Sequence, residues 1–426
     1  MPDRTVAPPV AHFSDIVLQP RKTFTLPNGI DINLVNHGSL PLSRMALVWD
    51  GGLLDYPSKA TNMVLATTIQ EATRKMSGAE VADMIDFCGA RVSGGISNHH
   101  TSLEMVAINS SFKRLLPLLA DFSREASFPE NAVEASKMRI AANRRIQFER
   151  VSYIASVQLH ALLQGATHPA SNVALPEDIE SVNRRMVTDR YDDLRRSRLH
   201  IFVGGMLSDE LIENVAATFS ELPESDISPV KIIPFNAEPP QRTDIDRPES
   251  VQSAVAMGFP AVDRSHPDYI ALRLAVMALG GYFGSRLMTN IREEKGLTYG
   301  INAATLGTHE GAFIEISAQC DRRYVEQVID ETVKEIENLG VNPPCGDELN
   351  RLRRHAWSQL ATAADSAFGT LEHYMTELRV GTSPTYFREQ LDTIASLTPE
   401  KIAEMARLYL RPERMSVVTA GSRWAD

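Results

Sequence analysis

The chain has few cysteines, and their positions suit neither a disulfide framework nor a metal site. Three occur among 426 residues, at Cys88, Cys320 and Cys345, and none forms a Cys-x-x-Cys pair. An odd number of widely spaced thiols argues against the disulfide-bonded class of small secreted domains and against a cysteine zinc site. We therefore expect a reducing compartment.

Long apolar runs and an excess of positive charge are also missing. The first twenty residues contain no apolar stretch long enough for a signal peptide, and no transmembrane segment follows. We expect a cytoplasmic protein with no membrane partner, although a mature form without its leader would have the same sequence. The formal net charge is −11, which argues against a nucleic-acid partner because phosphate binding requires a basic face.

Proline is concentrated near the middle of the chain. Six prolines lie between Leu222 and Ser250, a density that opposes regular structure. Because the length favours two or three domains, we predict an N-terminal domain over residues 1–222, a linker over 223–250 and a C-terminal domain over 251–426. The short apolar run at 230–235 could add one edge strand.

The segments on either side of this linker repeat one plan. The first half ends in the strand pattern RLHIFVGG (198–205) and the second in RMSVVTAG (414–421). A charged helical stretch precedes each, beginning near Thr188 and Thr398. Earlier in each half the same elements are predicted: a strand at 44–49 and 252–259, a helix at 58–73 and 267–279, then a second helix, at 77–89 in the first half.

The second half also predicts a hairpin and a long helix. The strands 297–306 and 312–319 alternate around a turn at 308–311. Asp321 is a suitable N-cap for the helix that follows, and Gly340 with two prolines ends it. Interleaved helices and hairpins predict an α+β fold, in which two similar domains each cover a mainly antiparallel sheet with helices.

The most specific motif lies at residues 279–300, LGGYFGSRLMTNIREEKGLTYG. A helix from Ser285 should end at Gly296, which can take the left-handed conformation. The following strand should alternate, placing Tyr299 on one face with Leu297 and Ile301. Arg292 on the last helical turn and Tyr299 at the start of the strand can then converge.

This motif resembles that of the second domain in the pitrilysin/insulinase (M16) family of zinc peptidases, and weaker similarity extends from about residue 26 to residue 421. The resemblance implies two domains that form half of a clamshell chamber. It also implies that Arg292 and Tyr299 bind the backbone carbonyls of a substrate and help stabilise the tetrahedral intermediate. The alternative is that Arg292 stabilises a helix C-terminus and pairs with a nearby carboxylate, while Tyr299 packs in the core.

In the first half, one predicted helix resembles the family's catalytic helix but lacks its zinc-binding side chains. The signature His-x-x-Glu-His falls on TNMVLATTIQEAT (61–73), where the matching positions hold Met63, Ala66 and Thr67. Residues at positions i and i+4, such as 63 and 67, share a helix face, so two ligands at these positions could bind one metal ion. A thioether and a neutral hydroxyl are poor ligands for hydrolytic zinc, and a methyl group cannot act as the general base. The alternatives are that these three residues only pack a helix, or that this face has an undefined role in binding peptide.

The family's remaining ligand, a glutamate on a later helix, corresponds to the vicinity of Asn143 and Arg144, where no carboxylate occurs. An arginine there would repel a dication. Shifting the alignment with the family's signature does not restore a zinc ligand, because no histidine lies between His37 and His99. The one histidine pair, His99-His100, should point to opposite faces of a strand, and we interpret it as a pair of ordinary strand-end residues.

The favoured hypothesis is a metal-free subunit of a heterodimeric peptidase that degrades or processes unfolded peptides. A homologous, zinc-bearing partner would supply the metal and the general base, and this chain would supply Arg292 and Tyr299 without a cofactor of its own. One alternative is a scaffold or assembly subunit with no part in proteolysis. The other is an autonomous metallopeptidase with an unrecognised metal site.

Overall fold

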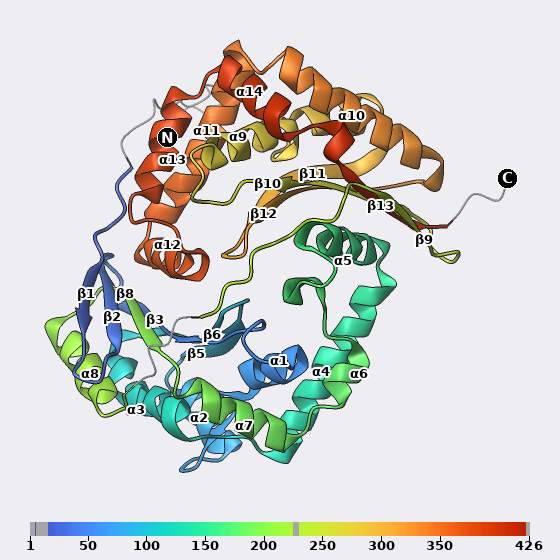
Figure 1. Cartoon of the computed structure of the whole chain (residues 1–426). Coiled ribbons are helices and arrows are strands. Elements are labelled where there is room, and N and C mark those ends of the chain that lie inside the picture. Colours follow the sequence, from blue (N-terminus) through green and yellow to red (C-terminus); the bar gives the residue numbers. More distant parts are fainter. Residues whose placement is uncertain (1–4, 6–15, 225–229, 423–426) are drawn as a thin grey trace.

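The computed structural model describes residue 5 and residues 16–224 and 230–422. The chain forms two units, one blue to green and one yellow to red in Figure 1. Their sheets are turned toward each other, and most helices lie on the outer sides (Figure 1). The α+β prediction with two similar domains is confirmed.

The two sheets share one strand order. The first runs β1 (Lys22–Thr25), β2 (Asp31–Asn36), β8 (Leu199–Gly205), β3 (Leu42–Asp50), β6 (His100–Ile108), β5 (Arg91–Ile96). The second runs β11 (Thr298–Gly307), β12 (Ala312–Cys320), β10 (Ser253–Ala261), β13 (Ser416–Gly421), β9 (Arg242–Asp246). In each sheet one pair is parallel, β2 with β8 and β9 with β13, and the remaining pairs are antiparallel. Apart from β1, the second sheet therefore repeats the first strand for strand.

Strand β9 belongs to the second sheet, although the sequence analysis assigned its residues to the linker. The apolar run at 230–235 forms no strand, so the prediction of an edge strand there is wrong. The edge strand of this region is β9, in which polar and apolar residues alternate. An edge position tolerates the prolines that flank it.

The helices of the first unit are α1 (Lys59–Thr68), α2 (Gly78–Phe87), α3 (Asn109–Glu125), α4 (Glu130–Glu149), α5 (Val151–Gln164), α6 (Pro176–Glu180), α7 (Arg184–Leu194) and α8 (Asp209–Ser220). Those of the second are α9 (Tyr269–Gly280), the π-helical segment η2 (Met288–Glu294), α10 (Val325–Val341), α11 (Gly346–Ala364), α12 (Ala367–Val380), α13 (Tyr386–Ser396) and α14 (Pro399–Tyr409). Single turns of 3₁₀ helix are η1 (Pro169–Ser171), η3 (Arg322–Tyr324) and η4 (Pro412–Arg414).

Capping side chains fix several of these boundaries, and two differ from prediction. Thr398 caps α14 as expected, but α7 begins after Asn183, so Thr188 lies inside that helix. Asp321 caps the short turn η3, and α10 starts only at Val325. Helix α1 also ends earlier than predicted, because residues 72–73 form strand β4 (Ala72–Thr73), which pairs with β7 (Ala126–Ser127).

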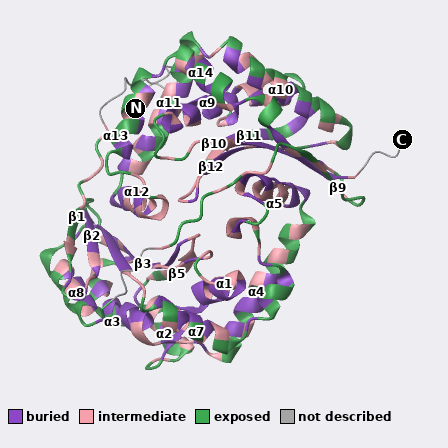
Figure 2. Ribbon diagram, viewed as in Figure 1, coloured by how far each residue is buried: buried purple, intermediate pink, exposed green. Residues whose placement is uncertain are grey.

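Two helices exchange between the units. Helix α5 of the first unit packs on the second sheet, burying Leu159 against Phe313 and Val418. Helix α12 of the second unit packs on the first sheet, burying Leu371 against Phe202. Each sheet therefore has its main helical layer on the outer side and one borrowed helix on the inner side, and Figure 2 shows both helices with buried faces. This exchange holds the two units together through apolar burial.

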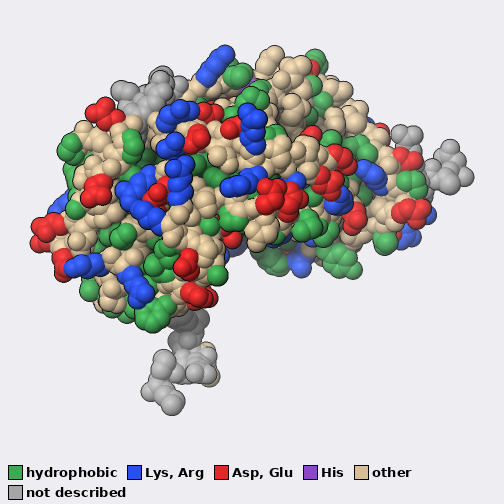
Figure 3. Space-filling view, turned by 90° about the horizontal axis from the view of Figure 1, so that it is seen from below, with side chains coloured by type: hydrophobic (Ala, Val, Ile, Leu, Met, Phe, Trp, Pro, Cys, Tyr) green, Lys and Arg blue, Asp and Glu red, His purple; other side chains and the backbone are tan. Residues whose placement is uncertain are grey.

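The surface carries charges of both signs. On the face shown in Figure 3, Lys and Arg side chains are interspersed with Asp and Glu, without a broad basic patch. In the part of the chain that the structure describes, no helix combines the length and apolar character needed to cross a membrane.

Candidate functional site

Helix α1 presents the three positions singled out in the sequence to two different neighbours. Ser58 caps the helix by accepting the Thr61 N–H at 3.1 Å. Met63 and Thr67 are half-buried and face α4, as their i, i+4 spacing requires. Ala66 is buried beneath β5, where a Cβ at Gly94 would lie 1.7 Å from the Ala66 carbonyl oxygen.

The side chains of Met63 and Thr67 contact residues of α4. Thr67 Oγ1 lies 2.5 Å from Ser136 Oγ and 3.0 Å from the Val64 carbonyl oxygen. Arg144 donates from Nη2 toward the Met63 sulfur at 3.7 Å. The hydroxyl of Thr67 is thus satisfied within the helix pair, and a guanidinium occupies the space beside Met63.

These donors do not fit a zinc ion. The Met63 sulfur accepts from the guanidinium of Arg144, a permanent cation that repels a dication. Among the residues that the structure describes, no three or more His, Cys, Asp or Glu side chains are grouped so that they could hold a metal. No chemistry of this chain is therefore derived through a metal at α1.

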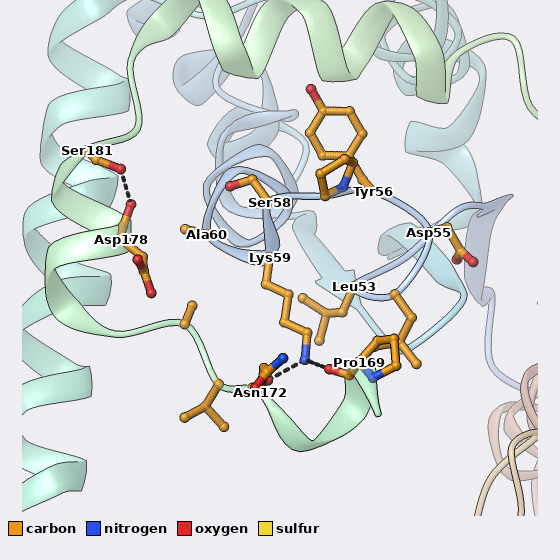
Figure 4. Close-up of a pocket in the computed structure, with 14 residues that line it drawn as sticks. Leu53, Asp55, Tyr56, Ser58, Lys59, Ala60, Pro169, Asn172, Asp178 and Ser181 are labelled. Atoms are coloured by element: carbon orange, nitrogen blue, oxygen red, sulfur yellow. Dashed lines mark hydrogen bonds between the residues drawn. The ribbon is translucent and has the colours of Figure 1, made fainter. Parts of the chain in front are cut away.

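A pocket of about 670 Å³ opens beside the first turn of α1 (Figure 4). Lys59 reaches into it and donates to the backbone carbonyls of Pro169 and Asn172 (Figure 4). Burial, together with the positive charge of Arg144, lowers the pKa of Lys59 to about 8. Two cations therefore lie near each other at this end of the helix.

Within the second-half motif, helix η2 carries Arg292. As predicted, Gly296 takes the left-handed conformation, with φ of 63°. Its N–H bonds to the Arg292 carbonyl at 3.2 Å, and the Leu297 N–H bonds to the Ile291 carbonyl at 3.0 Å. The chain therefore turns sharply from the helix into β11, which brings the two halves of the motif together.

Tyr299 does not lie where the alternation predicted. The register of β11 against β12 shifts between Thr298 and Ile301, and Leu297 and Ile301 are buried while Tyr299 is 89% exposed. Thr298 Oγ1 holds this bulge by accepting the Gly300 N–H at 3.1 Å and donating to the Gln319 carbonyl at 2.6 Å. The prediction of one shared face is wrong because a bulge redirects the side chain. The alternative in which Tyr299 packs in the core is also wrong.

Arg292 stacks on an exposed ring beside this strand. Its guanidinium carbon lies 5.0 Å from the centre of the Phe283 ring, which is 63% exposed. No ion pair to Arg292 is formed within the described residues. The planar donors of the arginine therefore remain available on the surface, close to where β11 begins.

The comparisons with known proteins agree with this architecture. Residues 181–355 match the family model described as the peptidase M16 inactive domain. Over these residues the chain resembles the peptidase M16 family, as the sequence motifs indicated.

Proteins similar to this chain carry contrasting names. It is 22% identical over 403 residues to the Bacillus subtilis (strain 168) protein named uncharacterized zinc protease YmxG, covering 91% of this chain and 95% of that protein. It is 22% identical over 276 residues, 62% of either chain, to the non-peptidase homolog YmxG of Helicobacter pylori (strain ATCC 700392 / 26695). The solved structure of a peptidase M16 inactive domain from Pseudomonas fluorescens has a TM-score of 0.85 at 21% identity, covering 96% of this chain and 99% of that one. The likeness to that structure shows the fold alone, so any activity of this chain has to be inferred from its own residues.

Sequence reasoning missed a polar cluster between the two units of this chain. His99 Nδ1 lies 2.8 Å from Asp55 Oδ1, and its Nε2 lies 2.7 Å from Glu310 Oε1. Burial opposes the charged ring, but the hydrogen bonds and charges of Asp55 and Glu310 raise the pKa of His99 to about 9. Its neighbour His100 turns instead toward Asp50, at 3.6 Å, and burial lowers the pKa of His100 to about 4.

No local signal could have identified His99 as a contact between the units, because Glu310 lies 211 positions further along the chain. The residues near Met63 and those near Arg292 also remain two separate groups. Within the described residues, no hydrogen bond or ion pair joins them.

Proposed function

We propose that this chain is the non-catalytic, substrate-binding subunit of a two-chain peptidase. Its homologous partner carries the zinc ion and the general base, and the two chains form a dimer that encloses unfolded peptides. This chain contributes Arg292 and Tyr299 together with part of the chamber wall. The proposal starts from the similarity to the M16 family and adds a partner, a substrate class and a role for two residues.

The observation that carries the proposal is the contrast between the two halves. Around α1 a guanidinium lies against Met63, and none of the three positions offers a zinc ligand or a base. At the start of β11, in contrast, the bulge turns Tyr299 outward and Arg292 retains a free guanidinium. A chain without any role in peptide turnover would have no need to keep the second arrangement.

The side chains of Arg292 and Tyr299 have suitable chemistry for peptide recognition. An arginine presents a planar set of donors that match a carbonyl or carboxylate, and a phenol supplies one donor to a developing oxyanion. Phe283 holds the Arg292 guanidinium by a cation–π contact, and the bulge at Thr298 fixes the direction of Tyr299. They can therefore act across an interface on a peptide that the partner hydrolyses.

The test is reconstitution with the zinc-bearing homologous subunit from the same organism. The two chains should co-elute in gel filtration, and the mixture should cleave an internally quenched peptide much faster than either chain alone. Arg292→Ala or Tyr299→Phe should lower turnover about ten-fold or more while the chains still co-elute. Arg323→Ala is the control, since Arg323 also lies near a ring, 5.5 Å from the centre of Tyr324, but on η3, where it is exposed and paired with Asp321.

Other results would favour the alternatives. If both variants support full turnover in a stable complex, the chain is an assembly subunit and the proposal fails. If the chain purified alone holds stoichiometric zinc and cleaves the peptide, it is an autonomous metallopeptidase. Elemental analysis of the isolated chain separates that outcome from contamination by the partner.

A further inference from the structure

The guanidinium of Arg144 forms hydrogen bonds to oxygen atoms on one side only. Its Nη1 donates to Gln147 Oε1 at 3.0 Å and to Tyr153 Oη at 2.5 Å. Its Nε is buried without a hydrogen-bond partner, and Nη2 has the Met63 sulfur as its contact. The Nε and Nη2 hydrogens form the edge of an arginine that binds a carboxylate with two parallel bonds.

Arg144 differs from two other half-buried arginines, Arg44 and Arg286, which are paired with carboxylates. Arg44, which is similarly half-buried, pairs with Glu104 and Glu372, both at 2.6 Å. Arg286 pairs with Glu348 at 2.9 Å. In the described part of the chain, neither Arg144 nor Lys59 has a carboxylate within ion-pair distance, although the net charge of the whole chain is −11.

Met63 covers the unsatisfied edge of Arg144. A methionine side chain is unbranched and adapts its shape easily, and Met63 is half-buried, so it can move aside for a ligand. Lys59 adds a second positive charge in the adjoining pocket, close enough to Arg144 for the two charges to act on each other. The site therefore combines two parallel N–H donors of Arg144, a methionine that can move aside and the positive charge of Lys59.

We propose that the Nε–Nη2 edge of Arg144, with Lys59 nearby, binds a carboxylate group of a bound peptide at the place where catalytic relatives would hold their metal. The inference rests on the proposed function in taking a peptide as the ligand, and it adds a substrate preference. Either the C-terminal carboxylate or an acidic side chain can supply the group, since both have the same geometry.

The experiment measures binding of three short peptides to the full chain alone by calorimetry. One has a free C-terminus and no acidic side chain, the second is its C-terminal amide, and the third is the amide with one internal glutamate. The acid should bind about ten-fold or more tightly than the plain amide, as expected for a charge-assisted bidentate contact. The third peptide decides whether a side-chain carboxylate can replace the terminal one.

Arg144→Gln should abolish the preference for a carboxylate. Arg145→Gln is the matched control, because Arg145 is exposed on the same helix and paired with Glu180. Met63→Ala, which uncovers the guanidinium edge, should strengthen binding of the acid and tests the site without removing the arginine.

Equal affinity for acid and amide, a preference that survives Arg144→Gln, or no binding of any peptide would each overturn the inference. These results need no partner and no turnover. A chain that selects carboxylates but activates no zinc-bearing subunit would retain this site and lose the proposed function, so the two failures are distinct.

Discussion

His99 Nε2 lies 2.7 Å from Glu310 Oε1, and this contact joins the loop before β6 to the β11–β12 turn of the other unit. His99 also bonds to Asp55 at 2.8 Å, so one imidazolium is held between two carboxylates. Asn98 Nδ2 donates to the same Glu310 oxygen at 3.2 Å, and the Glu310 backbone carbonyl accepts the Phe235 N–H at 2.8 Å. The cluster therefore fixes the relative position of the two units.

The first prediction concerns the pH dependence of stability. The raised pKa of His99, about 9 against an ordinary 6.5, means that its stabilising contribution is complete below about pH 6.5 and is lost as the pH rises through 9. The pKa of Glu310 is lowered from 4.5 to about 2, because its bonds to His99 and Thr308 outweigh burial, so its contribution is complete above about pH 4.5 and is lost as the pH falls through 2.

Thermal unfolding measured from pH 6 to pH 10 checks this prediction. The wild-type chain should lose stability over the alkaline range, whereas His99→Gln should be less stable at pH 6 and have a flatter profile. His355→Gln is the control, because His355 lies on α11 and bonds to neutral Gln359. Parallel pH profiles of the wild type and His99→Gln would contradict the assignment.

The second prediction concerns restoration of a metal site. In Met63→His/Thr67→His two imidazoles face Arg144, whose positive charge should keep zinc affinity low. Adding Arg144→Glu replaces the repelling group with a third ligand and should raise the affinity about 100-fold or more. Zinc retained after dialysis against a chelator, together with competition titration, measures the difference. Arg145→Glu in place of Arg144→Glu is the control, and equal affinity of the double and triple variants would refute the role of Arg144.

The sequence was sufficient where the pattern is local. Spacing along one helix correctly placed Met63 and Thr67 on a common face, and a glycine correctly marked the end of the helix before β11. Carrying over the family spacing also located Arg144, which the structure brings within 3.7 Å of Met63.

Long-range pairing explains what the sequence did not reveal. The outward turn of Tyr299 depends on a hydrogen bond from Thr298 to Gln319, 21 positions away. Strand β9 exists because it pairs with β13, where Thr419 bonds to Asp244 across 175 positions. Alternation within a single strand contains no information about either contact.

The third prediction tests the exchanged helices. Leu371 on α12 is fully buried against the first sheet, so Leu371→Ala should lower the free energy of unfolding by about 2–5 kcal/mol through lost burial and a residual cavity. Leu159→Ala on α5 should act similarly on the second sheet, where Leu159 is equally buried. Urea unfolding followed by circular dichroism measures the change. Leu408→Ala, at a position 49% exposed, should change stability by less than about 0.5 kcal/mol.

The fourth prediction links the β11 bulge to the proposed function. Thr298→Val keeps the size of the side chain but removes the hydroxyl that joins Gly300 to Gln319. Leaving these backbone groups unpaired should cost about 1–3 kcal/mol of stability. It should also lower peptide turnover in the reconstituted complex, because Tyr299 loses its fixed direction.

Thr305→Val is the matched control on the same strand, since the Thr305 hydroxyl is buried without a hydrogen-bond partner. This change should be neutral or slightly stabilising, because it removes an unsatisfied polar group. Urea unfolding and turnover of the reconstituted complex distinguish the two variants. If both leave turnover and stability equally unchanged, the bulge does not position Tyr299, and the exposed tyrosine cannot be attributed to this hydroxyl.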